Sequence, residues 1–249
     1  MSQSDQPIQL ERVSKRFGAF RVLDDVSLGV SQGEATVVLG RSGTGKSVLL
    51  KHIVGLLLPD QGQVFVQGQD ITVLSVADIA RVRRQIGFLF QNAALFDSMT
   101  VGDNVGFPLR RHTQLSDESI RVRAREKLAL VGLDRDYDKL PATLSGGMRK
   151  RAGLARAMAL DPAILLVDEP SAGLDPITSE EIDDLLVRVK HELGTTLIVV
   201  THNIPSARRI GDTLVFLHEG RVLARGTAAQ LEGSEHSIVR QFMSSEAGG

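Results

Sequence analysis

The sequence contains no cysteine, which excludes a disulfide framework and thiol chemistry and is compatible with a reducing cytosol. Long apolar runs are also missing: the stretch 53–58, one of the longest, is far shorter than the roughly 18 residues that a membrane span needs. Residues 1–7 are polar and lack the apolar core of a signal peptide. We therefore expect a soluble chain that reaches a membrane only through partners.

Neither sign of charge is in excess, because 29 Lys and Arg residues face 30 Asp and Glu residues and the net charge is −1. Such a balance argues against a strongly nucleic-acid-binding protein, and we expect no nucleic-acid partner, although a local basic patch can lie within a neutral total. No internal repeat is visible. With 249 residues and 42% apolar content, the chain can bury a substantial core.

The segment 40–47, GRSGTGKS, has the spacing G-x-x-x-x-G-K-S of a phosphate-binding loop. Its glycines let successive backbone N–H groups turn inward around a phosphate, where a Cβ would obstruct the approach. Lys46 can reach the β- and γ-phosphates, and the Ser47 hydroxyl can ligate Mg²⁺. An accidental glycine-rich turn would not require the strand predicted before it, at 35–39, or the helix predicted after it, at 47–54. The predicted nucleotide-binding residues are Gly40, Arg41, Ser42, Gly43, Thr44, Gly45, Lys46 and Ser47.

A second apolar run, 164–168, ends in a carboxylate, Asp168, and Glu169 follows at once. A buried strand would deliver Asp168 beside the phosphates, where it can hold Mg²⁺, commonly through water. Glu169 points differently and is placed to polarise an attacking water as general base. The run 197–201 leads to His202 at the end of a predicted central strand, where ligands of open α/β sheets gather. We interpret the other five histidines as structural.

The segment 144–148, LSGGM, precedes the helix-like segment 149–160 and closely resembles the LSGGQ signature of ATP-binding-cassette (ABC) ATPases. Met148 stands in place of the usual Gln. Two glycines after a serine at a helix start make a second anion-binding N-terminus, which one nucleotide does not obviously need. In the ABC family, the signature of one subunit closes on the ATP held by the other. The resemblance therefore implies a second ATPase subunit, in a homodimer, and adds Ser145, Gly146 and Gly147 to the nucleotide-binding residues.

Other markers of this family stand in the expected order between about residues 8 and 226. Phe17 matches the aromatic that stacks on adenine, with a core residue as the alternative interpretation. Gln91 matches the glutamine that touches Mg²⁺ and the lytic water, Asp175 lies in the D-loop, and His202 matches the switch histidine. The resemblance implies ATP and Mg²⁺, catalytic roles for Glu169, His202, Gln91 and Lys46, and metal binding by Ser47, Gln91 and Asp168.

The order of elements predicts an α/β P-loop NTPase with a RecA-like parallel core sheet, an N-terminal antiparallel β subdomain and a helical subdomain that carries the signature. Alternation of apolar and polar residues predicts the antiparallel strands, and strand–helix alternation predicts the parallel ones. The predicted strands are 8–13, 21–30, 63–67, 163–167 and 196–201, with a hairpin at 214–217 and 221–224. A predicted helix spans 178–192.

In the predicted helical subdomain, Ser116 begins a segment that ends at Gly132 and whose apolar face comprises Ile120, Val122, Leu128 and Val131. We expect one cassette, residues 1–249. Its parts are a catalytic α/β lobe at 1–90 and 161–226, the helical subdomain at 91–160 and a C-terminal tail at 227–249. In that tail a short helix is expected within 227–243, and residues 244–249 are expected to fray.

Other classes of nucleotide protein fit less well. None of the seven lysines lies in the guanine-reading motif of a small GTPase. The 54 residues from Gln91 to Ser145 (145 − 91) leave no room for the coiled-coil arms of DNA-repair ABC proteins. A nucleotide-binding scaffold without turnover is the alternative from another class, but it would be expected to have lost Glu169 or His202. The best interpretation is a transport ATPase that works with an integral membrane permease.

The surface that would meet such a permease resembles that of the Mla-type phospholipid-transport (toluene-tolerance) ATPases, at 90–101, 103–110, 145–151 and 170–177. Met148 agrees with this branch. The resemblance implies transport of phospholipids between the membranes of a double-membraned bacterium, from the cytoplasmic face of the inner membrane. It also implies periplasmic lipid-binding and small cytoplasmic accessory subunits. The alternative is the ATPase of a polar-solute importer for amino acids or metal ions.

Residues 93–110 are predicted to form the groove for a helix of the membrane subunit. Leu95, Phe96 and Met99 make an apolar cluster with no obvious role in phosphate chemistry, and apolar patches often mark contacts. The alternative is that Phe96 belongs to the core of the helical subdomain.

Overall fold

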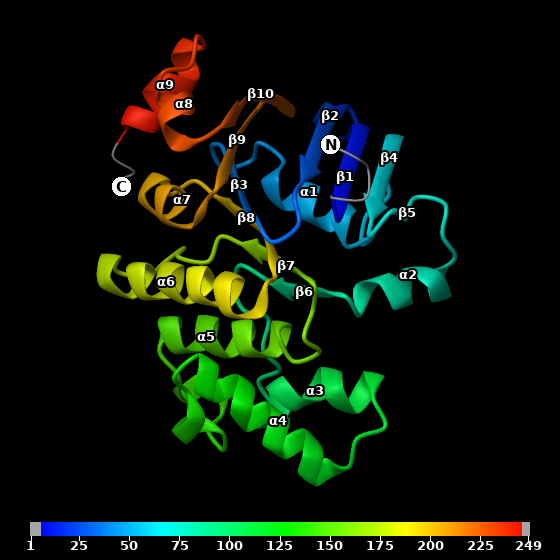
Figure 1. Ribbon diagram of the computed structural model, residues 1–249, viewed down its shortest axis with the longest axis vertical. Helices are drawn as coiled ribbons and strands as arrows, with labels where there is room; N and C mark the ends of the chain where they lie inside the picture. Colours follow the sequence, from blue (N-terminus) through cyan, green and yellow to red (C-terminus); the bar gives the residue numbers. More distant parts are fainter. Residues whose placement is uncertain (1–5, 246–249) are drawn as a thin grey trace.

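The computed structural model describes residues 6–245, and a six-stranded sheet forms its centre (Figure 1). Five strands of this sheet are parallel, and the sixth, β10, pairs antiparallel with β9 at one edge. Side chains of three central strands are buried throughout, as expected of a parallel sheet covered on both faces. The strand order is β10 (Arg221–Gly226), β9 (Thr213–His218), β3 (Ala35–Leu39), β8 (Thr196–Thr201), β7 (Ile164–Asp168) and β6 (Ile86–Leu89).

A second, antiparallel sheet packs beside the first and is formed by the N-terminal part of the chain. β1 pairs with both β2 and β4, and its register shifts where Arg12 adopts a positive φ of 49°. Such bulges bend and twist a strand. The strand order is β2 (Phe20–Val30), β1 (Ile8–Phe17), β4 (Gln61–Val66) and β5 (Gln69–Asp70). The predicted antiparallel strands are therefore present, whereas the two-residue β5 was not predicted.

Alternation along the central strands divides the core into two clusters. Successive side chains of a strand point to opposite faces, so Val37 and Val38 fall into different clusters. The cluster with Val38 lies against the antiparallel sheet and α1 (Lys46–Ile53). The cluster with Val37 includes residues of α6 (Pro176–Leu193) and α7 (Ile204–Ile210) and continues into the helical end. The central sheet thus joins both halves of the molecule and can position groups at the ends of its strands.

Three helices form the end of the molecule opposite the β10 edge: α3 (Val101–His112), α4 (Asp117–Leu130) and α5 (Gly146–Ala157) (Figure 1). Ser116 caps α4 by accepting a hydrogen bond from the Ser119 amide, as its sequence predicts. The predicted apolar face needs one correction, because Val122 is 47% exposed. The buried positions of α4 are Ile120, Ala124 and Leu128, one helical turn apart, and a residue two positions after Ile120 faces away from them.

Two segments differ from the expectation. The exposed helix α2 (Val76–Arg83) and the short strand β6 precede the helical end and were not predicted. A short helix was expected within 227–243, and the structure has two in the tail: α8 (Ala228–Glu232) ends at Gly233, and α9 (Ser237–Ser244) begins after a turn. Residues 246–249 of the segment expected to fray lie outside the described residues.

Helix α9 packs on the central sheet, because Val239 and Met243 are buried and the Phe242 ring lies 4.9 Å from that of Phe216 in β9. Within residues 6–245, the structure contains no helix that combines the length and the apolar character of a membrane span.

Candidate nucleotide site

The glycine-rich loop joins the end of β3 to the start of α1. Gly43 and Gly45 have positive φ values of 81° and 101°, which glycine adopts without strain. A Cβ on Gly45 would lie 2.8 Å from the carbonyl oxygen of Val22, so this position has no room for a side chain. A Cβ on Gly43 would meet nothing within 4 Å, and the backbone there faces open space. The loop is therefore held against β2 on one side and presents bare backbone on the other.

Lys46 is buried at the start of α1 and lies over the loop. Its Nζ donates hydrogen bonds to the carbonyl oxygens of Gly40, at 2.8 Å, and Arg41, at 3.1 Å. The same nitrogen lies 3.5 Å from Oε1 of Glu169. Burial lowers the pKa of Lys46, and the negative charges of Glu169 and Asp168 oppose this shift. The side chain thus provides a positive charge at the rim of the loop.

Ser47 and Asp168 come from elements far apart in the sequence and meet directly. Ser47 Oγ donates a hydrogen bond of 2.9 Å to Oδ1 of Asp168 at the end of β7. Burial raises the pKa of Asp168, while the hydrogen bond from Ser47 opposes that rise. A hydroxyl oxygen beside a carboxylate suits a small hard cation such as Mg²⁺, which takes few protein ligands and completes its shell with water and phosphate oxygens. Consistent with this, residues 6–245 hold no cluster of three or more His, Cys, Asp or Glu side chains that could bind a metal alone.

Glu169 adopts a positive φ of 47°, which is uncommon for a residue other than glycine and turns its side chain away from that of Asp168. Oε2 accepts a hydrogen bond of 3.2 Å from Thr201 Oγ1 and lies 3.0 Å from Nδ1 of His202. Its backbone N–H donates to the Val200 carbonyl oxygen at 2.9 Å. The ends of β7 and β8 therefore hold Glu169, His202 and Lys46 in one connected group.

These residues line a cavity of about 460 Å³, the size of a small-ligand pocket. Of the predicted residues, the structure brings to this cavity Phe17, Ser42, Gly43, Gly45, Lys46, Ser47, Gln91, Glu169 and His202. Val22 and Val48 also line it and were missed, because apolar residues within a strand and a helix give no separate signal in the sequence.

Four other predicted residues do not line this cavity: Gly40, Arg41, Thr44 and Asp168. Gly40 and Arg41 hold Lys46 through their carbonyl oxygens, and Arg41 and Thr44 line an adjacent cavity that shares Ser42 and Gly43 with the first. Asp168 reaches the site only through Ser47.

The signature residues Ser145, Gly146 and Gly147 do not line this cavity, and neither does Asp175. Ser145 caps α5 by accepting from the Met148 amide, and Asp175 caps α6 by accepting from the amide of Thr178 at 3.0 Å. The hydrogen bonds from Thr178 hold the pKa of Asp175 below its usual value. The two helix starts pack together, since a Cβ on Gly147 would lie 2.5 Å from a methyl carbon of Thr178.

The fold and this site define an ATP-binding cassette, and the chain belongs to the ABC transporter family: its residues 23–172 match the family model described as ABC transporter. The chain is 40% identical over 242 residues to the intermembrane phospholipid transport system ATP-binding protein MlaF of Haemophilus influenzae, covering 97% of this chain and 92% of the relative. The Escherichia coli K12 protein of the same name is 38% identical over 242 residues, with 97% and 90% covered.

A second relative is longer than this chain. The probable ribonucleotide transport ATP-binding protein mkl of Mycobacterium tuberculosis is 44% identical over 236 residues, which are 95% of this chain and 66% of the relative. This chain therefore spans slightly less than two thirds of that relative's length. Among solved structures, a dimeric bacterial ABC transporter cassette has a TM-score of 0.83 and 35% identity, covering 88% of this chain and 98% of that one.

Proposed function

We propose that this chain is the ATP-hydrolysing subunit of a membrane transporter that moves phospholipids between the membranes of a double-membraned bacterium. The proposal of ATP hydrolysis rests on one observation: Lys46, Glu169 and His202 line the same cavity, beside the Ser47–Asp168 pair. Each group has the chemistry that phosphoryl transfer to water needs, where catalysis consists mostly of positioning and charge stabilisation.

The geometry supports the following roles. Lys46 and the amides of residues 43–47 bind the β- and γ-phosphates of ATP, and Phe17 offers an aromatic face to adenine at the rim of the cavity. Ser47, Asp168 and Gln91 would hold Mg²⁺, which neutralises charge on the phosphate oxygens when bound. Glu169 orients the attacking water and accepts its proton, and His202 contacts Glu169 and faces the γ-phosphate.

The nucleotide site is completed by a second subunit in this proposal. Ser145, Gly146, Gly147 and Asp175 do not line the cavity of their own chain. Ser145 is exposed at the N-terminus of α5, where an anion held by another molecule could bind. A solved cassette similar to this chain is dimeric. We infer a head-to-tail homodimer in which each signature covers the ATP of the other subunit. ATP would close the dimer because it bonds both faces, and hydrolysis would remove that bridge.

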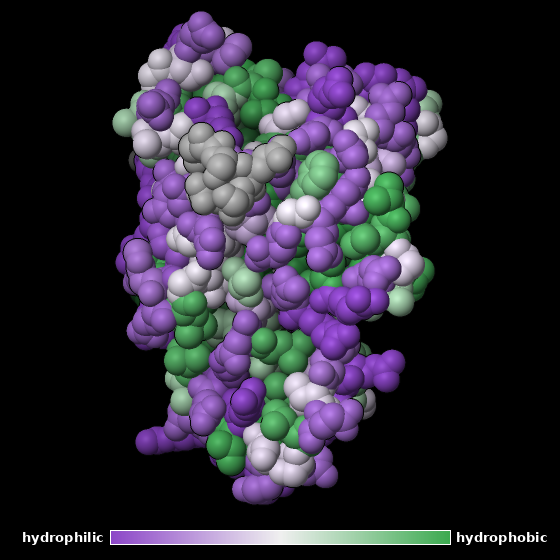
Figure 2. All heavy atoms as spheres, turned by 45° about the vertical axis from the view of Figure 1, so that its right-hand side comes forward, coloured by the Kyte–Doolittle hydropathy of each residue, from purple (hydrophilic) through white to green (hydrophobic). Residues whose placement is uncertain are grey.

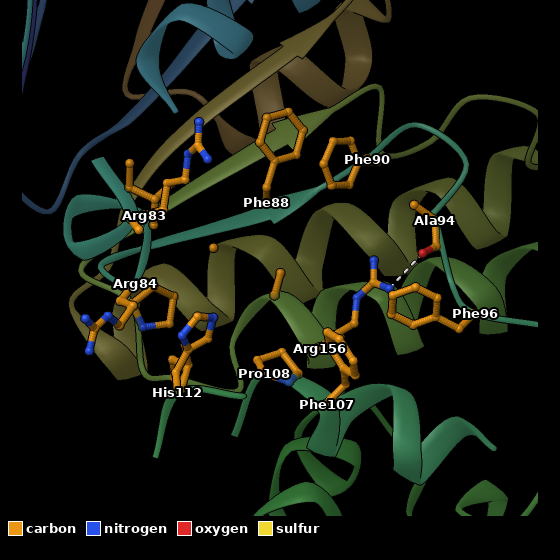
Figure 3. A pocket seen from close by; sticks show the side chains of 16 residues that line it. Arg83, Arg84, Phe88, Phe90, Ala94, Phe96, Phe107, Pro108, His112 and Arg156 are labelled. Atoms are coloured by element: carbon orange, nitrogen blue, oxygen red, sulfur yellow. Dashed lines mark hydrogen bonds between the residues drawn. The ribbon is translucent and has the colours of Figure 1, made fainter. Parts of the chain in front are cut away.

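The membrane permease docks on a second cavity, of about 540 Å³, between β6, α3 and α5; we call it the groove (Figure 3). Aromatic and proline side chains form its walls, with Phe96 and Phe107 at one end, their ring centroids 5.0 Å apart. Apolar groups on this side of the molecule are surrounded by a largely hydrophilic surface (Figure 2). Phe96 is 43% exposed, which favours a contact residue over a core residue.

The polar side chains in and beside the groove belong to residues that do not line the nucleotide cavity. The buried side chain of Asn104 accepts a hydrogen bond from the Phe96 amide, at 2.8 Å, and donates to the Phe96 carbonyl oxygen, which fixes the loop. Arg83, Arg84 and Arg156 line the groove, and no carboxylate does. None of these arginines has a salt bridge among residues 6–245. A permease helix that carries both apolar and acidic side chains could therefore insert into it, at the cytoplasmic face of the inner membrane.

The proposals of a phospholipid substrate and of periplasmic lipid-binding and small cytoplasmic accessory subunits rest on the resemblance to the MlaF proteins, which are named for an intermembrane phospholipid transport system. A polar solute is the second candidate, because the mycobacterial relatives are named for probable ribonucleotide transport.

The test is to purify the chain with the membrane subunits encoded beside its gene and to reconstitute the complex in vesicles. ATP-dependent phospholipid movement, with phospholipid found in the complex by mass spectrometry, is the expected result. ATP-dependent movement of a ribonucleotide without lipid movement would favour the second candidate instead.

A further inference from the structure

Lys150 is a buried lysine in the second turn of α5, with only 6% of its surface exposed. Its Nζ donates hydrogen bonds to two backbone carbonyl oxygens, that of Gln91 and, at 2.8 Å, that of Glu169. It forms no salt bridge within the described part of the chain. Burial lowers its pKa, an effect that the charges of Asp168 and Glu169 oppose. Burying an ammonium group in this way is costly unless its hydrogens find acceptors.

The two acceptors belong to two loops that border the nucleotide cavity. Gln91 follows β6, Glu169 follows β7, and the side chains of both line the cavity. The backbone of Glu169 is thereby held at both ends: its N–H donates to Val200 in β8 and its C=O accepts from Lys150 in α5. These two hydrogen bonds restrain Glu169 in a backbone conformation with positive φ, which residues other than glycine rarely adopt.

Helix α5 holds the same Gln91 loop at further points, toward the groove. Arg156 donates to the carbonyl oxygens of Ala93 and Ala94, each at 2.7 Å, and Figure 3 shows the second of these bonds beside Phe96. Between the two cations, a Cβ on Gly153 would lie 2.9 Å from that of Ala93, so the helix and loop are in close contact. One rigid helix therefore contacts the groove at Arg156 and Glu169 at Lys150.

We propose that Lys150 is a positioning residue: its ammonium group ties the backbones of Gln91 and Glu169 to the signature helix, so that the position of this helix sets the position of the Glu169 carboxylate. This role rests on the proposed hydrolysis of ATP. Docking at the groove moves α5 and the loop of residues 91–94 together, and Lys150 transmits that movement to Glu169.

The test uses Lys150→Met, which keeps the length and apolar stem of the side chain and removes its three donors. With the full chain, we expect kcat for ATP hydrolysis to fall about 10- to 100-fold, as small misplacements of a catalytic group do. We expect KM for ATP to change less than about threefold, because no phosphate contact is lost. Lys150→Arg retains charge and donors and should recover part of kcat.

Lys190→Met is the matched control, because Lys190 is similarly buried, at 7% exposed, but pairs with Asp212 at 2.8 Å, outside both cavities. It should lower the melting temperature and leave kcat unchanged. Lys150→Met should keep a melting temperature within a few degrees of the parent, since an apolar isostere removes the desolvation cost of a buried charge.

Two results would overturn the role of Lys150. The first is that Lys150→Met has the same kcat as the parent. The second is that its loss of kcat equals its loss of folded protein and that Lys150→Arg recovers no activity. Failure of the proposed function is a different outcome, in which the unchanged protein hydrolyses no ATP above the rate of Glu169→Gln. That outcome would overturn the hydrolytic site and the positioning role together.

Discussion

The nucleotide cavity and the groove have similar volumes, about 460 and 540 Å³, but opposite electrostatic designs. In the nucleotide cavity, opposite charges meet, because Lys46 Nζ lies 3.5 Å from Oε1 of Glu169, and the neutral Ser47 hydroxyl donates a hydrogen bond to Asp168. In the groove, three arginines lie among aromatic rings, and no carboxylate lines the walls. Arg83 and Arg156 donate hydrogen bonds to backbone carbonyl oxygens.

This difference indicates which part of the chemistry the chain supplies alone. The fold can hold oppositely charged groups such as Lys46 and Glu169 in place before the ligand binds, and a bound phosphate then takes over contacts with Lys46. Uncompensated cations on an apolar wall instead favour a partner that brings negative charge, since complementary potentials guide association. We therefore regard the first cavity as a reaction site and the second as a docking site. Substitutions in one should leave binding at the other intact, and the coupling proposed through Lys150 concerns the rate of hydrolysis.

The largest expected effect on binding is that of Lys46→Ala, which removes the positive charge beside the loop carbonyls. The Kd for ATP should rise roughly 10- to 100-fold, because a hydrogen bond to a charged group contributes roughly 1.5–3 kcal/mol. Equilibrium binding of a fluorescent ATP analogue measures this. Binding of the permease to the groove should stay as it was, and a loss of both functions at once would contradict the separation of the two cavities.

A smaller effect is expected from Phe96→Asp, which places a carboxylate where an apolar contact is proposed and next to Arg156, whose guanidinium lies 5.9 Å from the Phe96 ring. Co-purification with the permease should fall about tenfold, as for loss of an interface anchor worth more than about 1 kcal/mol. ATP binding by the isolated cassette should not change.

Leu193→Asp is the control for this variant, because Leu193 is equally exposed, at 43%, and lies at the end of α6 outside the groove. It should co-purify normally. A drop of many degrees in the melting temperature of Phe96→Asp alone would assign Phe96 to the core instead.

The smallest effect on ATP hydrolysis or docking is expected at a residue that lines neither cavity. Asp183 in α6 is 2% exposed, its Oδ1 has no hydrogen-bond partner among the described residues, and burial raises its pKa to about 6. The folded state therefore favours the protonated form, and stability falls as the pH rises from about 4 through 6. Asp183→Asn should stabilise the protein at pH 7.5 by at most about 3 kcal/mol, at about 1.4 kcal/mol per pKa unit.

Thermal unfolding of Asp183→Asn and the parent at pH 4.5 and 7.5 measures this difference. The gain should shrink toward zero at the lower pH, and ATP hydrolysis should be unchanged at the higher one. An equal gain at both pH values would show that the carboxyl does not titrate as expected.

Most residues of the nucleotide cavity could be predicted from the sequence because they lie in short contiguous segments with recognisable motifs. The loop at 40–47 and the strand ending at Asp168 need particular residues at fixed spacings, and a strand end is a recognisable place. Their roles remain predictions, but the structure gathers most of them into one cavity. The helical pattern of α4 failed at Val122, because an apolar residue on an exposed helix face differs from a buried one only after packing.

The groove and Lys150 were much harder to predict. Phe96 was identified by its apolar character, but the arginines of the groove come from α2, from the residue after it and from α5, and only the packed fold brings them together. Lys150 has backbone carbonyls as partners, which any residue carries, so its contacts leave no pairwise signal in the sequence. It also stands between Arg149 and Arg151, so the sequence does not distinguish it from its basic neighbours.

The central claim, that Glu169 is the base of a hydrolytic site, is tested most directly by Glu169→Gln. The amide keeps the shape of the carboxylate and can still accept from Thr201, but it cannot take a proton from water. ATP turnover should fall about 100- to 10,000-fold while ATP binding persists, and size-exclusion chromatography with ATP should show a stabilised dimer. Glu232→Gln, which loses only a surface pair with Arg208, should behave as the parent. Turnover by Glu169→Gln at the parent rate would contradict the account.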